Sequence, residues 1–87
     1  GSPLGDWRGR LRALAAHHAH RLGAMQDAAG DGATAYAVTR RVFRHRTLDR
    51  HELRMAVVET LAHLEHLVAQ GALGREDRGG AWWFVPA

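Results

Sequence analysis

The sequence predicts a mostly helical α+β domain, in which three helices are followed by a C-terminal two-stranded β-hairpin. Apolar residues recur at helical spacing in three segments, 7–29, 34–43 and 50–70. Two short apolar stretches separated by paired glycines follow them, a pattern typical of a hairpin. The 87 residues suffice for one domain, which we assign to residues 6–87. Because the chain begins Gly1-Ser2 rather than with Met, we expect residues 1–5 to be an expression remnant and a flexible N-terminus.

The first predicted helix spans residues 7–29. Its apolar residues recur every three or four positions from Trp7 to Met25, which places them on one face of a helix. Asp6 is the expected N-cap, because a short carboxylate side chain can accept from the first free backbone N–H groups. The glycine-rich cluster 30–32 ends the helix.

The second predicted helix is short and begins at Thr34, whose hydroxyl is a suitable N-cap. A brief extended stretch at 33–35 could precede it. The polar segment 44–50 breaks the apolar periodicity and is expected to be a loop. Asp49 is the expected cap of the helix that follows.

The third predicted helix, at about 50–70, has the most regular apolar spacing in the chain. Gly71 follows it at the place where a left-handed C-cap residue belongs. The hairpin is expected to pair 72–75 with 81–85 through a turn at 76–80 and to end at Pro86. Three helices and a hairpin in this order are typical of a winged-helix domain, with the third helix as recognition helix and the hairpin as wing.

The expected core contains the apolar residues that repeat on the helices, together with one ring of the tryptophan pair. Side chains of a strand alternate between its two faces, so one tryptophan should be buried and the other exposed. The predicted core residues are Leu11, Leu14, Leu22, Val38, Val42, Leu61, Leu64, Val68 and one of Trp82 and Trp83.

Composition excludes several classes of function. All twelve basic residues are arginine and nine residues are acidic, for a net charge of +3 with histidine neutral. Cysteine is absent, which excludes disulfides, thiolate zinc sites and cysteine nucleophiles and fits a reducing compartment, so we expect a cytoplasmic location. No apolar stretch approaches the roughly 20 residues that span a bilayer. A core this small leaves little room for a roofed active site.

Three segments together carry a family resemblance. They are LAAHHAHRL at 14–22, TAYAVTRRVF at 34–43 and ETLAHLEHLVAQGAL at 59–73, and a tryptophan follows in the last strand. In order and spacing they resemble the C-terminal winged-helix domain of metallo-β-lactamase-fold hydrolases, the β-lactamase-associated winged helix. The resemblance extends over nearly all of residues 8–85.

The resemblance implies a non-catalytic accessory domain. In that family, catalysis belongs to a preceding lactamase-like domain with a His-x-His-x-Asp-His metal motif. Here His18-Ala19-His20 is followed by Arg21-Leu22, so the motif is missing. We therefore expect this chain to be no enzyme and to hold no cofactor. The resemblance implies that it packs on a metallo-β-lactamase-fold catalytic domain in cis and shapes its substrate cleft, and that zinc is bound only in that catalytic domain.

The first helix carries the candidate partner surface. His17 and His20 share a helix face and could chelate a divalent ion, but no third ligand is evident, so an exposed or domain-facing pair is the alternative. His18 falls on the apolar stripe and is expected to be a half-buried packing residue. On the third helix, Glu59 and His63 have metal-compatible spacing, yet a solvated face explains them as well. The residues assigned to the interdomain surface are Trp7, Arg10, His17, His20 and Arg21.

A basic cluster supports a second hypothesis, a free-standing winged-helix regulator of transcription that binds DNA. Positions 40–54 contain six arginines and only two acidic residues, which gives this segment a net charge of +4 beside the start of the third helix. The expected turn opposes this reading, because it contains Glu76 and Asp77. A homodimer formed through the first helix is a third possibility. The candidate nucleic-acid contacts are Arg40, Arg41, Arg44, Arg46, Arg50 and Arg54.

Overall fold

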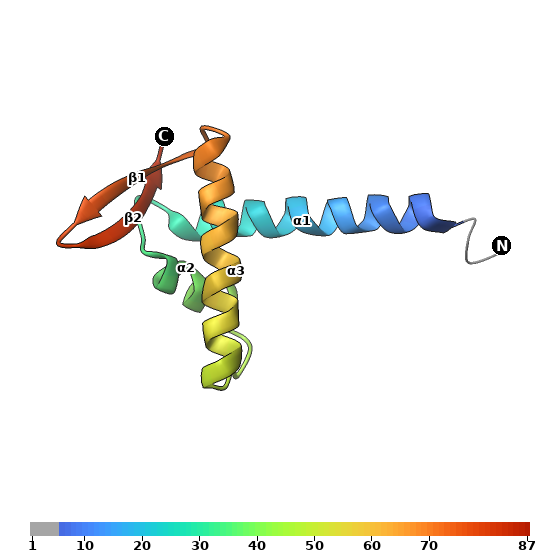
Figure 1. The fold of residues 1–87 in the computed structure, drawn as a ribbon, viewed down its shortest axis with the longest axis horizontal. Coiled ribbons are helices and arrows are strands. Elements are labelled where there is room, and N and C mark those ends of the chain that lie inside the picture. Colours follow the sequence, from blue (N-terminus) through green and yellow to red (C-terminus); the bar gives the residue numbers. More distant parts are fainter. Residues whose placement is uncertain (1–5) are drawn as a thin grey trace.

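The computed structural model describes residues 6–87, which form three helices and one antiparallel two-stranded sheet. The expectation for residues 1–5 lies outside the described residues. The elements are α1 (Trp7–Ala29), α2 (Ala35–Val42), α3 (Arg50–Ala69), β1 (Leu73–Arg78) and β2 (Ala81–Pro86). In Figure 1, α1 and α3 cross at a steep angle, α2 lies beside the lower part of α3, and the hairpin lies on the side opposite the N-terminus. The predicted fold class is confirmed.

Local capping explains where two of the helices begin. The hydroxyl of Thr34 accepts a hydrogen bond from the backbone N–H of Ala37 at 3.2 Å. Asp49 and Glu52 form a reciprocal capping box, with distances of 2.8 and 3.1 Å between side-chain oxygen and backbone nitrogen. The predicted cap at Asp6 is wrong: its φ of −103° and ψ of 6° are not the extended values of an N-cap, and its side chain makes no capping hydrogen bond.

The chain leaves α3 through the left-handed glycine that the sequence predicts. Gly71 has a φ of 80°. The N–H of Gly71 donates to the carbonyl of Val68 at 3.0 Å, and the N–H of Ala72 donates to the carbonyl of Leu67 at 2.9 Å. This pair of bonds is a Schellman motif, which satisfies the last helical carbonyls and turns the chain towards β1.

The hairpin has a tighter turn than expected. The strands pair along their whole length, so Arg78 lies opposite Ala81. Gly79 and Gly80 alone connect them, with φ values of 63° and 86°. Positive φ at both central residues is the requirement of a two-residue type I′ turn. The predicted turn at 76–80 is therefore too long, because its first three residues continue β1.

A single residue joins the hairpin to the helices through the backbone. Ala33, in the connection between α1 and α2, forms an antiparallel bridge with Phe84 of β2. The N–H of each residue donates to the carbonyl of the other, at 3.0 and 2.8 Å. The extended stretch expected before α2 is thus present as one bridging residue.

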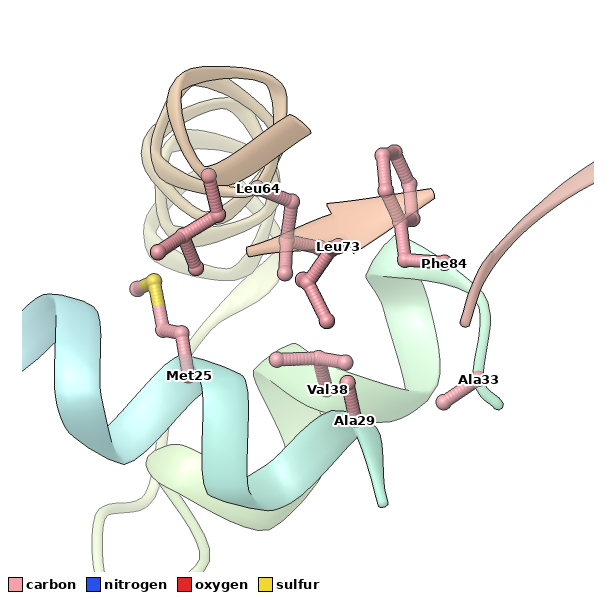
Figure 2. Close-up of a cluster of buried hydrophobic side chains, with 8 residues drawn as sticks. Met25, Ala29, Ala33, Val38, Leu64, Leu73 and Phe84 are labelled. Atoms are coloured by element: carbon pink, nitrogen blue, oxygen red, sulfur yellow. The ribbon is translucent and has the colours of Figure 1, made fainter. Parts of the chain in front are cut away.

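Every helix and both strands contribute to one small core (Figure 2). Phe84, Met25, Leu64 and Val38 are its largest fully buried apolar side chains. Their rings and methyl groups converge between α1, α2, α3 and the hairpin. The buried cluster consists of Met25, Ala29, Ala33, Val38, Leu64, Leu67, Leu73 and Phe84.

The predicted core is right on the inner faces of the helices and wrong at their uncovered ends. Val38 and Leu64 are buried, while Leu22, Val42 and Val68 are half-buried and pack against the cluster. Leu11, Leu14 and Leu61, in contrast, are exposed. The two leucines of α1 precede its crossing with α3, so no other described element covers them. Leu61 lies on the outer side of α3.

Neither tryptophan of the pair is fully buried. Trp83 is half-buried, Trp82 is exposed, and Phe84 occupies the buried position. Trp82 shares a strand face with Phe84 but lies closer to the turn. The turn end of the hairpin extends away from the helices (Figure 1), so only the residue nearer to them reaches the core.

Two leucine truncations distinguish the core from the uncovered part of α1. We expect Leu64→Ala to lower the free energy of unfolding by about 2–5 kcal/mol, because it opens a cavity among fully buried side chains. Leu14→Ala should change it by less than about 0.5 kcal/mol, because that side chain is 53% exposed. Urea denaturation followed by circular dichroism measures both, and equal losses would contradict the assigned core.

Candidate functional site

The N-terminal part of α1 extends beyond the body of the domain. We refer to residues 7–20 as the free half of α1. From Arg10 to His20 every residue is exposed, and Figure 1 shows this part of the helix projecting past α3. A helix of 23 residues is about 35 Å long, whereas the core lies at one end of it. The free half therefore contributes little to the core of this domain.

Large apolar residues nevertheless lie on one face of α1 at both of its ends, with His18 between them. Trp7, Leu11 and Leu14 follow one another at helical spacing and are each more than half exposed. The same face continues into Leu22, which packs against the core, and Met25, which is fully buried. The C-terminal half of this face is covered and the N-terminal half is not. A contiguous uncovered apolar stripe on a small domain indicates an interaction surface.

The free half is also strongly basic. Arg8, Arg10 and Arg12 lie on it, and the sequence has no acidic residue from 7 to 26. The guanidinium carbon of Arg8 lies 5.3 Å from the centre of the Trp7 ring, within the range of a cation–π contact. Two predicted surface residues, Trp7 and Arg10, thus lie exposed on one basic, apolar arm.

The histidines of α1 are exposed and do not complete a metal site. His17 and His20 are both accessible. His18 is exposed too, which corrects the expectation of a half-buried packing residue. Its ring centre lies 6.1 Å from that of His63 on α3, with the two rings inclined by 25°. Within residues 6–87, no group of three or more histidine, aspartate or glutamate side chains could hold a metal ion.

His63 is held by a local hydrogen bond instead. Its Nδ1 lies 2.8 Å from the carbonyl oxygen of Glu59, one helical turn earlier. A carbonyl can only accept, so Nδ1 carries the hydrogen of this bond. Both residues of this pair therefore have contacts within the domain, since Glu59 also pairs with Arg21.

Arg21 is used inside the domain. Its Nη1 lies 3.6 Å from Oε1 of Glu59 on α3, and its guanidinium carbon lies 4.8 Å from the centre of the Phe43 ring. The side chain is only 21% exposed. Arg21 thus contacts α3 through a long ion pair and Phe43 through its ring, within the domain. Of the five predicted surface residues, the other four present their side chains to solvent, and contact with a partner stays a prediction for all five.

The six arginines of positions 40–54 form the second candidate surface, which we call the arginine cluster. They lie on the C-terminal part of α2, on the loop that follows, and on the first turns of α3, and all are exposed. The ion pairs among the described residues involve three other arginines, which pair with Glu59, Glu65 and Glu76. Within residues 6–87, the arginine cluster therefore has no carboxylate partner.

One member of the arginine cluster has a structural role that the sequence did not reveal. Nη1 of Arg41 donates to the carbonyl oxygen of Ala28 at 2.7 Å. Ala28 is in the last turn of α1, where carbonyl groups lack helical partners and the helix dipole favours a cation. Arg41 therefore caps α1 from α2. The contact joins residues 13 positions apart, so no local spacing rule could have identified it.

Three other members line a hollow of about 150 Å³, which we call the arginine hollow. Arg40, Arg44 and Arg46 supply its charge. Nε of Arg44 donates to Nε2 of the neighbouring His45 at 3.0 Å, and the guanidinium carbon of Arg46 lies 5.8 Å from the centre of the Phe43 ring. The remaining lining residues are Thr39, Phe43, Leu48 and Leu53. Sequence analysis identified these arginines but not the hollow, which forms only when α2 and α3 pack.

The outer face of α3 is mainly apolar rather than basic. Met55, Val58 and Leu61 are exposed along it. Further along, Arg75 of β1 donates from Nη1 to both carboxylate oxygens of Glu65, each at 3.0 Å. This face therefore presents aliphatic groups and a closed ion pair beyond the first turns of the helix. In addition, no helix within residues 6–87 has the length and apolar character needed to cross a membrane.

Comparisons with known proteins agree with one another. The family model for the metallo-beta-lactamase-like, C-terminal domain matches residues 22–87. The crystal structure of a beta-lactamase domain protein from Burkholderia ambifaria is 35% identical to this chain, with a TM-score of 0.82 over 92% of it. This chain spans 24% of that one. A comparison with curated protein sequences gave no match. The family model begins at Leu22, within α1, whereas the structural match also includes part of α1 before Leu22.

Two arginine substitutions test whether the hydrogen bond of Arg41, rather than its charge, stabilises the domain. We expect Arg41→Gln to lower the free energy of unfolding by about 0.5–1.5 kcal/mol, because the hydrogen bond to Ala28 is lost. Arg40→Gln removes the same charge from the same helix turn and should have a smaller effect. Thermal unfolding of both variants compares them, and an equal loss for Arg40→Gln would show that charge alone is responsible.

Proposed function

The chain belongs to the family of metallo-β-lactamase-like C-terminal domains, and on this basis we propose that it is a non-catalytic accessory domain of a metallo-β-lactamase-fold hydrolase. The chain spans only a quarter of the related Burkholderia chain, which leaves room there for a separate catalytic domain. Residues 6–87 offer no three-ligand metal group. Zinc and the hydrolytic chemistry would accordingly belong to that other domain, and this domain would pack against it.

The uncovered apolar face of the free half of α1 is the observation that carries this proposal. Trp7, Leu11 and Leu14 are each more than half exposed on a helix whose other half lies in the core. Full burial of a large apolar side chain contributes about 1.5–3 kcal/mol. Covering these three would therefore stabilise a contact by a few kcal/mol, enough to hold two domains of one chain together.

The charge of the free half favours a partner of a different kind over a second copy. Arg8, Arg10 and Arg12 flank the apolar face, and no acidic residue follows Asp6 until Asp27. Two copies packed through this helix would bring arginines against arginines, which is unfavourable. An acidic, partly apolar surface on the catalytic domain is complementary. In this arrangement His17 and His20 lie at the edge of the contact and could border the substrate cleft.

Nucleic-acid binding is the second candidate, and the unpaired arginine cluster favours it. The middle of α3 argues against it, because beyond Arg54 its exposed face carries Met55, Val58 and Leu61 and no arginine. The hairpin adds little, since Arg75 is paired with Glu65 and Arg78 with Glu76. A DNA-binding surface would need free cations at these places. The accessory role therefore has the stronger support.

Amide hydrogen exchange tests the docking of the free half. We expect residues 7–16 to exchange rapidly in the isolated chain, because no other described element covers them. In the native gene product, where the catalytic domain covers them, exchange should be at least about tenfold slower. Mass spectrometry of peptic peptides measures both. Equal exchange in the two proteins would contradict the proposal.

A matched pair of variants shows whether the apolar face itself makes the contact. In the native gene product, Leu11→Asp should restore rapid exchange over the free half, because a carboxylate cannot be buried there without a partner. Ala16→Asp adds the same charge on the opposite, exposed face of the same helix and should leave the protection intact. Similar losses in both variants would show that the face is not the contact.

A further inference from the structure

We propose that the arginine hollow binds the phosphate group of a small phosphomonoester whose apolar or aromatic part contacts the hydrophobic wall of the hollow. This site is separate from the docking surface on the free half of α1, and it does not depend on the proposed function.

No acidic side chain lines the hollow. Arg40, Arg44 and Arg46 bring three guanidinium groups to a space whose other lining residues are uncharged. The sequence has no acidic residue between Asp31 and Asp49, and one carboxylate oxygen of Asp49 already accepts from the backbone of α3. Three like charges around one hollow repel one another, and a bound anion relieves that repulsion.

Two of the three guanidinium groups already have a contact within the domain. Arg44 donates a hydrogen bond to His45, and Arg46 lies near the face of the buried Phe43 ring. Arg40 is in the last turn of α2 and makes no ion pair among the described residues. Side chains that are already ordered lose less conformational entropy on binding, which strengthens the interaction with a ligand.

The number of donors favours phosphate over carboxylate. Each guanidinium is a planar fork of N–H donors, and one fork satisfies one carboxylate. A phosphomonoester carries a charge of about −1.5 to −2 and three terminal oxygens at neutral pH, so it can engage several forks together. Three arginines around one space are therefore better matched to a phosphate group.

The lining defines the rest of the ligand. Phe43, Leu48 and Leu53 form an apolar wall beside the arginines, which can contact a ring or a short aliphatic group next to the phosphate. The space of about 150 Å³ is a single hollow, well above the size of one water. An extended polynucleotide would instead need a continuous basic track, whereas beyond Arg54 the exposed face of α3 carries Met55, Val58 and Leu61.

Nuclear magnetic resonance of the chain labelled with ¹⁵N tests this site, with phenyl phosphate as the probe. We expect saturable shifts of the Nε–H signals of Arg40, Arg44 and Arg46, and little change at Arg10 on the free half of α1. Benzoate, with a planar carboxylate, should bind about tenfold more weakly. Absence of saturation, or equal affinity for benzoate, would overturn the proposal.

Matched arginine variants assign the binding to the hollow. Arg40→Gln and Arg44→Gln should each weaken phenyl phosphate binding by about tenfold, because each removes one charged donor fork. Arg10→Gln removes the same charge outside the hollow and should leave the affinity unchanged. An equal loss for Arg10→Gln would show non-specific attraction and overturn the proposal. Chemical shifts of Ala33 and Phe84 report whether each variant keeps its fold.

Inorganic phosphate and duplex DNA test whether the site prefers a small phosphomonoester, free phosphate or a nucleic acid. Inorganic phosphate should bind more weakly than phenyl phosphate, because it makes no contact with Phe43, Leu48 or Leu53. Equal binding of both would show a site for free phosphate and overturn the apolar part of the proposal. Tighter binding of duplex DNA through the same three arginines would instead identify a nucleic-acid surface and overturn the assignment to a small phosphomonoester.

Discussion

The burial of Phe84 between the helices is the contact on which the rest of the structure depends. A two-stranded hairpin is marginal by itself in water, and this one is held by one buried ring and by the reciprocal backbone bonds of Phe84 with Ala33. The same ring lies in the buried cluster with Val38 and Leu64, to which β1 adds Leu73. One residue near the C-terminus thereby unites the chain into one domain.

This core covers only part of the longest helix. It lies at the C-terminal end of α1, so Met25 is covered while Trp7 and Leu11, on the same face, are not. Apolar side chains at the N-terminal end of α1 thus have no partner within the described domain. Membership of a family of C-terminal domains gives this feature a direct physical interpretation, since a larger protein can supply the missing cover.

The arginines divide into those that hold the domain together and those that have no partner within it. Arg21 pairs with Glu59 of α3, and Arg41 caps α1 from α2, so both contribute to contacts between the helices. Arg75 and Arg78 are neutralised on the hairpin by neighbouring glutamates. The charge that remains is concentrated on the free half of α1 and around the arginine hollow. These two surfaces are separate, and each is suited to an anionic counterpart of a different size.

The sequence by itself determined the local features: the extent of α1, the caps at Thr34 and Asp49, and the left-handed Gly71. Each depends on residues within one or two turns of the chain, so spacing rules suffice. Only the tertiary structure decided that Leu11, Leu14 and Leu61 are exposed, that Phe84 rather than a tryptophan is buried, and that three arginines surround one hollow. Periodicity identifies the apolar face of a helix, but the length of that face that is covered depends on where distant elements cross it.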